Sequence, residues 1–120
     1  MGQPAKTEWQ SKLLLDLAFF LRAYPEEPAS DWRVRRPTMT AYRAAVDLIT
    51  AIDATDLPCP RIAPDREGGI QFEWDTLEIG IQPTGAFECL RVRANGETEE
   101  GTIAPAKARQ LVTSLARLCA

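Results

Sequence analysis

The pattern that most constrains this chain is a change in hydrophobic period near residue 70. Before that point apolar residues recur at helical spacing, and from there to residue 81 they fall at every second position. A period of two places alternate side chains on one face of a β-strand, so these apolar residues should share one buried face. They are Ile70, Phe72, Trp74, Leu77, Ile79 and Ile81. The polar residues between them predict an antiparallel sheet whose other face meets water.

Turn-forming residues divide residues 60–103 into a meander of four or five short strands. Gly68-Gly69 opens a strand, whereas a phosphate-binding glycine loop opens a helix, so we interpret the pair as a hairpin turn after a short strand at 61–63. Further two-residue turns are expected at Asp75-Thr76, Thr84-Gly85 and Asn95-Gly96. The last strand, 97–103, carries acids that discourage further pairing, which suits a sheet edge.

Helical spacing of apolar residues predicts helices at about 7–23, 38–54 and 104–119. The first helix has apolar residues at positions 13–15 and 17–21, which indicates burial on more than one side. Together with the meander, these helices predict a single α+β domain over residues 1–120. Two N-terminal helices and one C-terminal helix would cover one face of the sheet.

Composition excludes several kinds of chemistry. The 120 residues include no histidine, which removes His-dependent nucleophilic mechanisms and the commonest zinc sites, so we expect no enzyme activity, metal or cofactor. The three cysteines have no CxxC spacing and indicate buried or idle thiols in a reducing compartment. A net charge of −3 makes nucleic acid an improbable partner. No apolar run approaches the roughly 20 residues that span a membrane, so a cytoplasmic location is expected.

The two-residue turns set an expected register for the open face of the sheet. They place Glu73 opposite Glu78, and Arg91 opposite both Glu78 and Glu100, as a ladder of charges across the strands. A neighbouring arginine favours the ionised form of a carboxyl group, whereas a catalytic pair needs one protonated acid, so we do not expect a catalytic pair here. The same turns place Leu77 with Val92 and Ile79 with Leu90 on the core face.

The same register turns Phe87 and Cys89 outward, beside Gly80. Phe87 then either covers the strand glycine or belongs to a patch that binds another chain. The candidate interaction patch consists of Gly80, Phe87, Cys89 and Arg91. A second copy of the chain is one candidate partner, because a two-fold axis through the patch would make a homodimer.

The linker before the second helix holds the main concentration of basic residues. Arginines beside an aromatic ring can hold phosphates or stack on bases. The candidate anion contacts are Trp32, Arg33, Arg35, Arg36 and Arg43. The alternative is that these arginines pair with the protein's own acids or with those of a partner, because residues 65–100 hold nine acids and three arginines.

Residues 58–75, PCPRIAPDREGGIQFEWD, resemble a recurring pattern in small bacterial proteins. In that pattern a P-x-I-x-P segment precedes G-G-[IV]-x-[LF]-E-W and a hydrophobic meander, and a W-D-G-x-x-A-x-P segment stands upstream. Here Asp31-Trp32 to Pro37 occupies the upstream place, with RVRR between. The resemblance covers about residues 31–93. No activity is assigned to the pattern, so it implies the fold and a bacterial origin.

These observations favour a non-enzymatic protein-interaction or accessory module of a bacterial operon, for example an antitoxin. The alternative hypothesis is a protein that binds nucleic acid or small anions through the basic segment between Arg33 and Arg43. The two hypotheses use different surfaces, the open sheet face and the linker.

Overall fold

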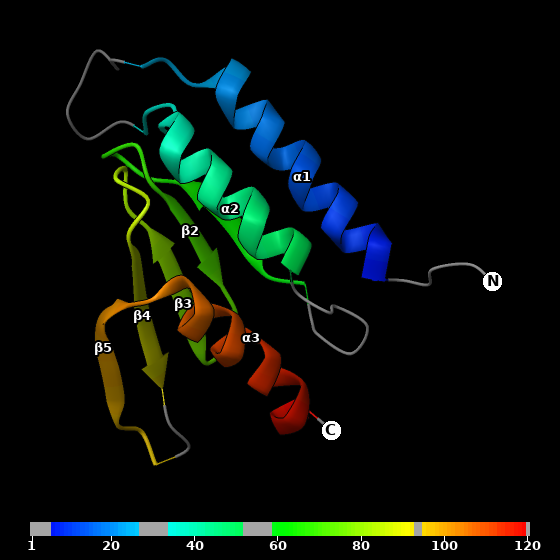
Figure 1. The fold of residues 1–120 in the computed structure, drawn as a ribbon, viewed down its shortest axis with the longest axis vertical. Coiled ribbons are helices and arrows are strands. Elements are labelled where there is room, and N and C mark those ends of the chain that lie inside the picture. Colours follow the sequence, from blue (N-terminus) through cyan, green and yellow to red (C-terminus); the bar gives the residue numbers. More distant parts are fainter. Residues whose placement is uncertain (1–5, 27–33, 52–58, 93–94, 120) are drawn as a thin grey trace.

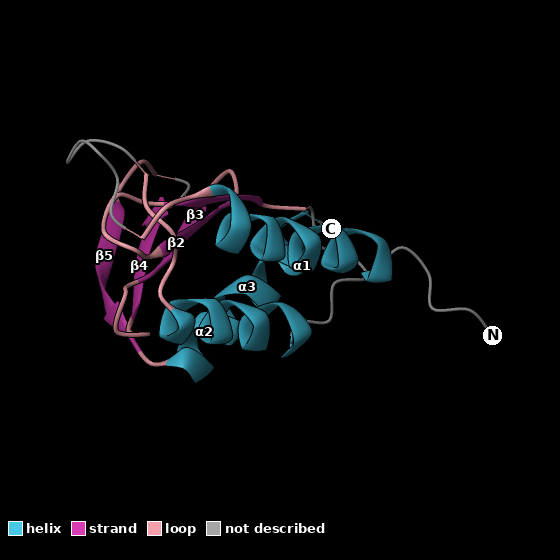
Figure 2. Cartoon of the chain, turned by 90° about the horizontal axis from the view of Figure 1, so that it is seen from above, coloured by secondary structure: helices cyan, strands magenta, loops and turns pink. Residues whose placement is uncertain are grey.

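The computed structural model describes residues 6–26, 34–51, 59–92 and 95–119. In this part of the chain three helices lie on one side of a five-stranded antiparallel sheet (Figure 1), and the view from above separates the two layers (Figure 2). The predicted α+β architecture is confirmed. The elements are α1 (Lys6–Ala23), α2 (Met39–Ala51), β1 (Arg61–Pro64), β2 (Ile70–Glu73), β3 (Leu77–Ile81), β4 (Phe87–Val92), β5 (Thr98–Ile103) and α3 (Pro105–Cys119).

The alternating residues predicted to face the helices are buried. All six, from Ile70 to Ile81, are at most 7% exposed and share one core cluster with side chains of the three helices. The rings of Phe72 and Trp74 stack there, with centroids 6.2 Å apart. The strands follow the order β1-β2-β3-β4-β5, so each pairs with its neighbour in the sequence.

Helix α1 packs against α2 along one side only. Leu13, Leu17 and Phe20 are buried, whereas Leu15 is 72% exposed and Phe19 is 53% exposed. The expectation that this helix is buried on more than one side is therefore wrong. At 3.6 residues per turn, a run of consecutive apolar residues inevitably points some of them away from the neighbouring helix.

The predicted helix bounds agree closely with the structure, except where the description stops. Helix α2 is described to Ala51, and the predicted end at residue 54 lies outside the described residues. Gln10 of α1 donates from Nε2 to the carbonyl oxygen of Ile49 at 2.7 Å. That bond joins α1 to the last described turn of α2.

Gly68-Gly69 lies in the hairpin turn between β1 and β2, as predicted. Asp65 shapes this turn, because its Oδ1 accepts the N–H groups of Glu67 and Gly69, each at 2.8 Å. Gly68 has a φ of +94°, a conformation that glycine adopts without steric cost. The glycine pair is therefore part of the scaffold.

The hairpin between β3 and β4 has a three-residue loop, not the expected two-residue turn. The N–H of Gln82 donates to the carbonyl of Ala86, and the N–H of Gly85 donates to the carbonyl of Gln82, both at 2.8 Å. Pro83 takes the second turn position and Gly85 has a φ of +89°. A type I turn followed by a left-handed glycine is the common three-residue hairpin loop.

This extra loop residue turns the side chains of β4 to the opposite face. Phe87 and Cys89 are 4% and 8% exposed in the core, and Leu90 lies opposite Glu78 on the open face. The predicted register of β4 is therefore wrong by one residue. The observed pairs are Leu77 with Arg91, Ile79 with Cys89 and Ile81 with Phe87.

The hairpin between β4 and β5 is also shifted by one residue from the expected register. Arg91 pairs with Glu99, and Glu100 pairs with Leu90. The predicted pair of Glu73 and Glu78 is confirmed. The predicted charge ladder thus loses its arginine, because Arg91 shares the helix-facing side with Cys89.

Thr38 ties the start of α2 to two hairpin turns at one end of the sheet. Its Oγ1 accepts the N–H of Ala41 at 3.0 Å, as an N-cap does, and donates to the carbonyl of Pro83 at 2.7 Å. Its own N–H donates to the carbonyl of Gly68 at 3.0 Å. These bonds hold both turns against the start of α2.

Candidate functional site

The residues of the predicted interaction patch do not lie together on the surface of the protein. Phe87 and Cys89 belong to the core, and Arg91 lies on their side of β4, half-buried. Gly80 faces the open side, where Gln71 covers it: an ideal Cβ on Gly80 would stand 3.0 Å from Gln71 Nε2. Both interpretations of an outward Phe87, as a glycine cover and as a sticky patch, are therefore wrong. A homodimer built on that ring loses its basis.

Arg36 of the basic linker is engaged within the molecule. Its Nε donates to the carbonyl of Tyr24 at 2.9 Å, and its Nη1 lies 3.5 Å from Glu26 Oε1. Its N–H donates to the carbonyl of Pro25 at 2.8 Å. Arg36 therefore fastens the linker to the end of α1, with Glu26 rather than an acid of the sheet as its ionic partner.

The other candidate anion contacts form no common site in the described part of the chain. Trp32 and Arg33 lie outside the described residues. Arg35 donates its N–H to the carbonyl of Asp65 at 3.2 Å, while its Nε is buried without a hydrogen-bond partner among the described residues. Arg43 is exposed on α2, and no described contact joins it to Arg35. Of the five candidate anion contacts, Arg35 and Arg43 are therefore the two that are described and have no described ionic partner.

The open face of the sheet carries two rows of side chains that run across all five strands. The first row starts with Arg61 on the β1 edge, and the second row starts with Ala63. In order from β1 to β5, the first row is Arg61, Glu73, Glu78, Leu90 and Glu100. The second row is Ala63, Gln71, Gly80, Glu88 and Thr102.

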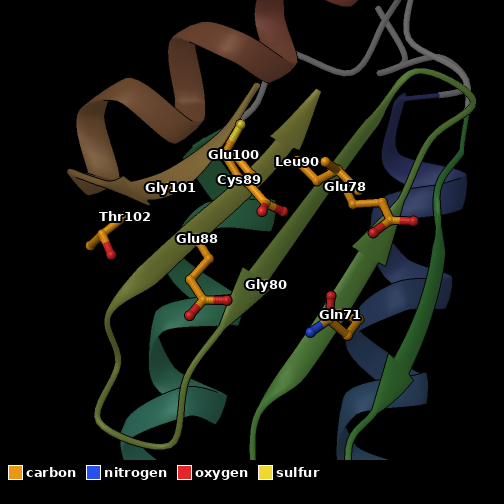
Figure 3. A pocket seen from close by; sticks show the side chains of 9 residues that line it. All are labelled: Gln71, Glu78, Gly80, Glu88, Cys89, Leu90, Glu100, Gly101 and Thr102. Carbon is orange, nitrogen blue, oxygen red and sulfur yellow. The ribbon is translucent and has the colours of Figure 1, made fainter. Parts of the chain in front are cut away.

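A hollow of about 610 Å³ lies over β3, β4 and β5 on this face, and we refer to it as the acidic hollow. Gly80 of the second row contributes no side chain to fill it. Figure 3 shows the carboxylates of Glu78, Glu88 and Glu100, which come from three successive strands. The full lining is Gln71, Glu78, Gly80, Glu88, Cys89, Leu90, Glu100, Gly101 and Thr102.

The charge of the acidic hollow is not balanced by cations among the described residues. On the open face, the described ion pair joins Arg61 to Glu73 at 2.8 Å, on the far side of the sheet from β5. Glu88 accepts a hydrogen bond from the side-chain amide of Gln82, which is neutral. Like charges that share a concave surface reinforce one another's potential, so the hollow attracts cationic groups.

The two described thiols, those of Cys59 and Cys89, are poorly suited to act as nucleophiles. Burial raises the pKa of the Cys89 thiol, although Arg91 and Lys107 oppose the effect. Burial also raises the pKa of Cys59, with Lys12 lowering it and Asp16 raising it further. A raised pKa leaves less thiolate near neutral pH, and the thiolate is the reactive form.

Among the described residues, no group of three or more Cys, Asp or Glu side chains is placed to hold a metal ion. No described helix combines the length and the apolar character needed to cross a membrane.

Comparisons with known proteins return no match. No protein family matches the chain, and no curated protein or solved structure matches it either. The acidic hollow and the linker arginines are therefore characterised by their own geometry and charge.

One local signal in the sequence points to the acidic hollow. Pro83 is favoured at the second position of a type I turn, and a glycine two residues later suits the left-handed position of a three-residue loop. That loop places Glu88 and Leu90 on the open face. The two-residue interpretation of Thr84-Gly85 hid the hollow because it turned these two side chains toward the core.

Proposed function

We propose that the protein is a non-enzymatic interaction module that holds a positively charged segment of a partner protein on the open face of its sheet. The acidic hollow is the observation that carries this proposal. Its carboxylates, from Glu78, Glu88 and Glu100, face water from three neighbouring strands without a described cation beside them. A partner that brings Lys or Arg side chains would relieve their mutual repulsion.

The hollow offers contacts for the stem of a basic side chain as well as for its charge. Leu90 lies between Glu78 and Glu100 in the first row. Lys and Arg place their aliphatic stems on apolar surface while the charged group stays in water. Each exposed ion pair contributes about 0.2–1 kcal/mol, so several pairs are needed for a specific complex.

An accessory role in a bacterial operon fits this chemistry. An acidic surface can cover a basic surface on a partner, including one that binds nucleic acid, because the two compete for the same cations. An antitoxin-like role is therefore part of the proposal. A toxin or nuclease gene beside this one would support it.

A titration with a flexible lysine-rich peptide labelled with a fluorophore tests the hollow directly. We expect the double variant Glu78→Gln, Glu100→Gln to weaken binding by about 2- to 30-fold, the equivalent of two exposed ion pairs. The matched control is the pair Asp47→Asn, Glu67→Gln, which removes the same charge from exposed positions on α2 and the β1–β2 turn.

Added salt should weaken the wild-type complex, because exposed charges are screened. Equal weakening by the double variant and by the control would show that the peptide responds only to net charge, and equal affinities for all three proteins would show that these carboxylates do not bind it. Either result would contradict the proposal.

A further inference from the structure

The direction of the backbone groups in β5 follows from the hairpin bonds. In an antiparallel ladder the N–H and C=O of one residue point to the same side, and successive residues alternate. Gln82 bonds to Ala86, so alternate residues of β4 bond to β3 and the residues between them bond to β5. Those that face β5 pair with Glu99, Gly101 and Ile103. The backbone groups of Thr98, Glu100 and Thr102 therefore point to the free edge of the sheet.

The two edges of the sheet differ. The β1 edge is blunted, because Pro64 has no N–H to offer and α1 packs against this strand. Strand β5 has six residues and contains no proline. In the described part of the chain no backbone hydrogen bond reaches its outward groups, and Figure 1 shows it at the open side of the sheet. Strand β5 is thus able to pair with one more strand.

We propose that the partner segment adds to β5 as a sixth, antiparallel strand, with Lys or Arg at alternate positions over the acidic hollow. This inference rests on the function proposed above and specifies how the segment binds. The first row of the open face ends at Glu100, beside the free edge. A residue directly opposite Glu100 would place its Cβ about 4.5–5.5 Å away, on the same face, where a cation meets this carboxylate.

The main competing explanation is that the acids of β5 merely prevent strands from pairing at this edge. A second copy of the chain is another competitor, and it would bring more acid to the edge. The charges of the first row favour a basic strand over an unpaired edge and over a second copy of the chain. At the β1 edge Arg61 neutralises Glu73, whereas at the β5 edge Glu100 has no described cation beside it. Backbone bonds are then available at Thr98, Glu100 and Thr102, and the charge of Glu100 acts at the middle one of these positions.

The test uses an alternating Lys-Thr peptide in two N-methylated forms. Opposite Thr98, Glu100 and Thr102, an antiparallel strand with its lysines on the open face turns the lysine amides toward β5. Methylation of the lysine amides blocks strand addition, and methylation of the threonine amides leaves that edge intact. The two peptides have the same charge and composition, so each controls for the other.

We expect the peptide methylated on lysine amides to bind about tenfold or more weakly than its isomer, because several backbone bonds are lost. With the isomer bound, amide hydrogen exchange of Thr98, Glu100 and Thr102 should slow by about tenfold or more, while the exposed amide of Gly96 stays fast. The reverse preference, with the same three amides protected, would support strand addition in the parallel direction.

Equal binding of the two isomers without amide protection would overturn strand addition and leave the proposed function standing. Failure of the unmethylated peptide to bind at all would contradict both. Protection of the three amides that rises with protein concentration alone would assign the edge to a second copy and overturn the inference.

Discussion

Gly69 lies directly against the carbonyl oxygen of Ile81 on the neighbouring strand. An ideal Cβ on Gly69 would stand 2.4 Å from that oxygen and 2.6 Å from Asp65 Oδ2. The glycine is thus required by a close approach of two backbones, at the point where the β1–β2 turn enters the sheet. Its neighbour Gly68 is required for a different reason, its positive φ.

Substitution of Gly69 by alanine should therefore destabilise the fold more than substitution of a glycine in open space. We expect Gly69→Ala to cost about 3 kcal/mol, because the backbone of Ile81 must move. Gly96→Ala should cost about 1 kcal/mol, since its Cβ meets nothing within 4 Å and only its φ of +88° is strained. Urea unfolding measures both, and equal losses would contradict the close approach.

The register of β4 predicts opposite responses at two apolar residues. Phe87→Ala should cost about 3–5 kcal/mol, because it leaves a cavity in the core. Leu90→Thr should cost about 1 kcal/mol or less, because its side chain lies on the open face and threonine suits a strand. A larger loss of unfolding free energy for Leu90→Thr than for Phe87→Ala would contradict the observed register and support the two-residue turn.

Thr38 should matter more than other helix threonines. Thr38→Ala removes the N-cap of α2 and the bond to Pro83, for an expected loss of about 2 kcal/mol. Thr50→Ala is the matched control, because its hydroxyl bonds only to carbonyls of its own helix, those of Val46 and Asp47. Thermal unfolding should separate the two variants, and a similar loss for both would show that the tie to Pro83 contributes nothing.

Arg36 and Arg43 should differ in the same way. Arg36→Gln gives up the bonds to Tyr24 and Glu26 and should cost about 1–2 kcal/mol. Arg43→Gln changes an exposed side chain of α2 and should stay within about 0.5 kcal/mol of the wild type. Equal stability of the two variants would free Arg36 for a ligand and revive the linker as an anion site.

The thiol of Cys89 should make the fold sensitive to alkaline pH. Burial raises its pKa above the ordinary 9.0, so the folded state favours the protonated thiol. This stabilisation is complete below pH 9.0 and is lost as the pH rises through the higher folded-state pKa. The unfolding free energy of the wild type should thus fall more steeply above pH 9.0 than that of Cys89→Ala. Parallel pH profiles would contradict the prediction.

Much of the fold was predictable because its signals are local. The alternation from Ile70 to Ile81 marks a buried face whatever else surrounds it, and the glycine pair at 68–69 marks a turn. The face of β4 was not predictable in this way, because each of its two sides carries two apolar residues and one charged residue. Phe87 and Leu90 are each suitable for a core, so the alternation in this strand favours neither register.

The sequence by itself determined the elements, their order and the inward face of β2 and β3. Successive side chains of a strand point to opposite faces whatever the strand pairs with, so the alternation of apolar and polar residues is enough to identify the buried face. For β4 the local signal of Pro83 and Gly85 permits a three-residue loop, and only the tertiary structure decided that this loop forms and therefore which side of the strand faces the helices. A loop of three residues instead of two turns the whole strand over, and the packing of Phe87 against the helices selects the longer loop. That choice brings Glu88 and Leu90 to the open face. The acidic hollow also depends on the second one-residue shift, between β4 and β5, because that hairpin places Glu100 beside Leu90 on the open face.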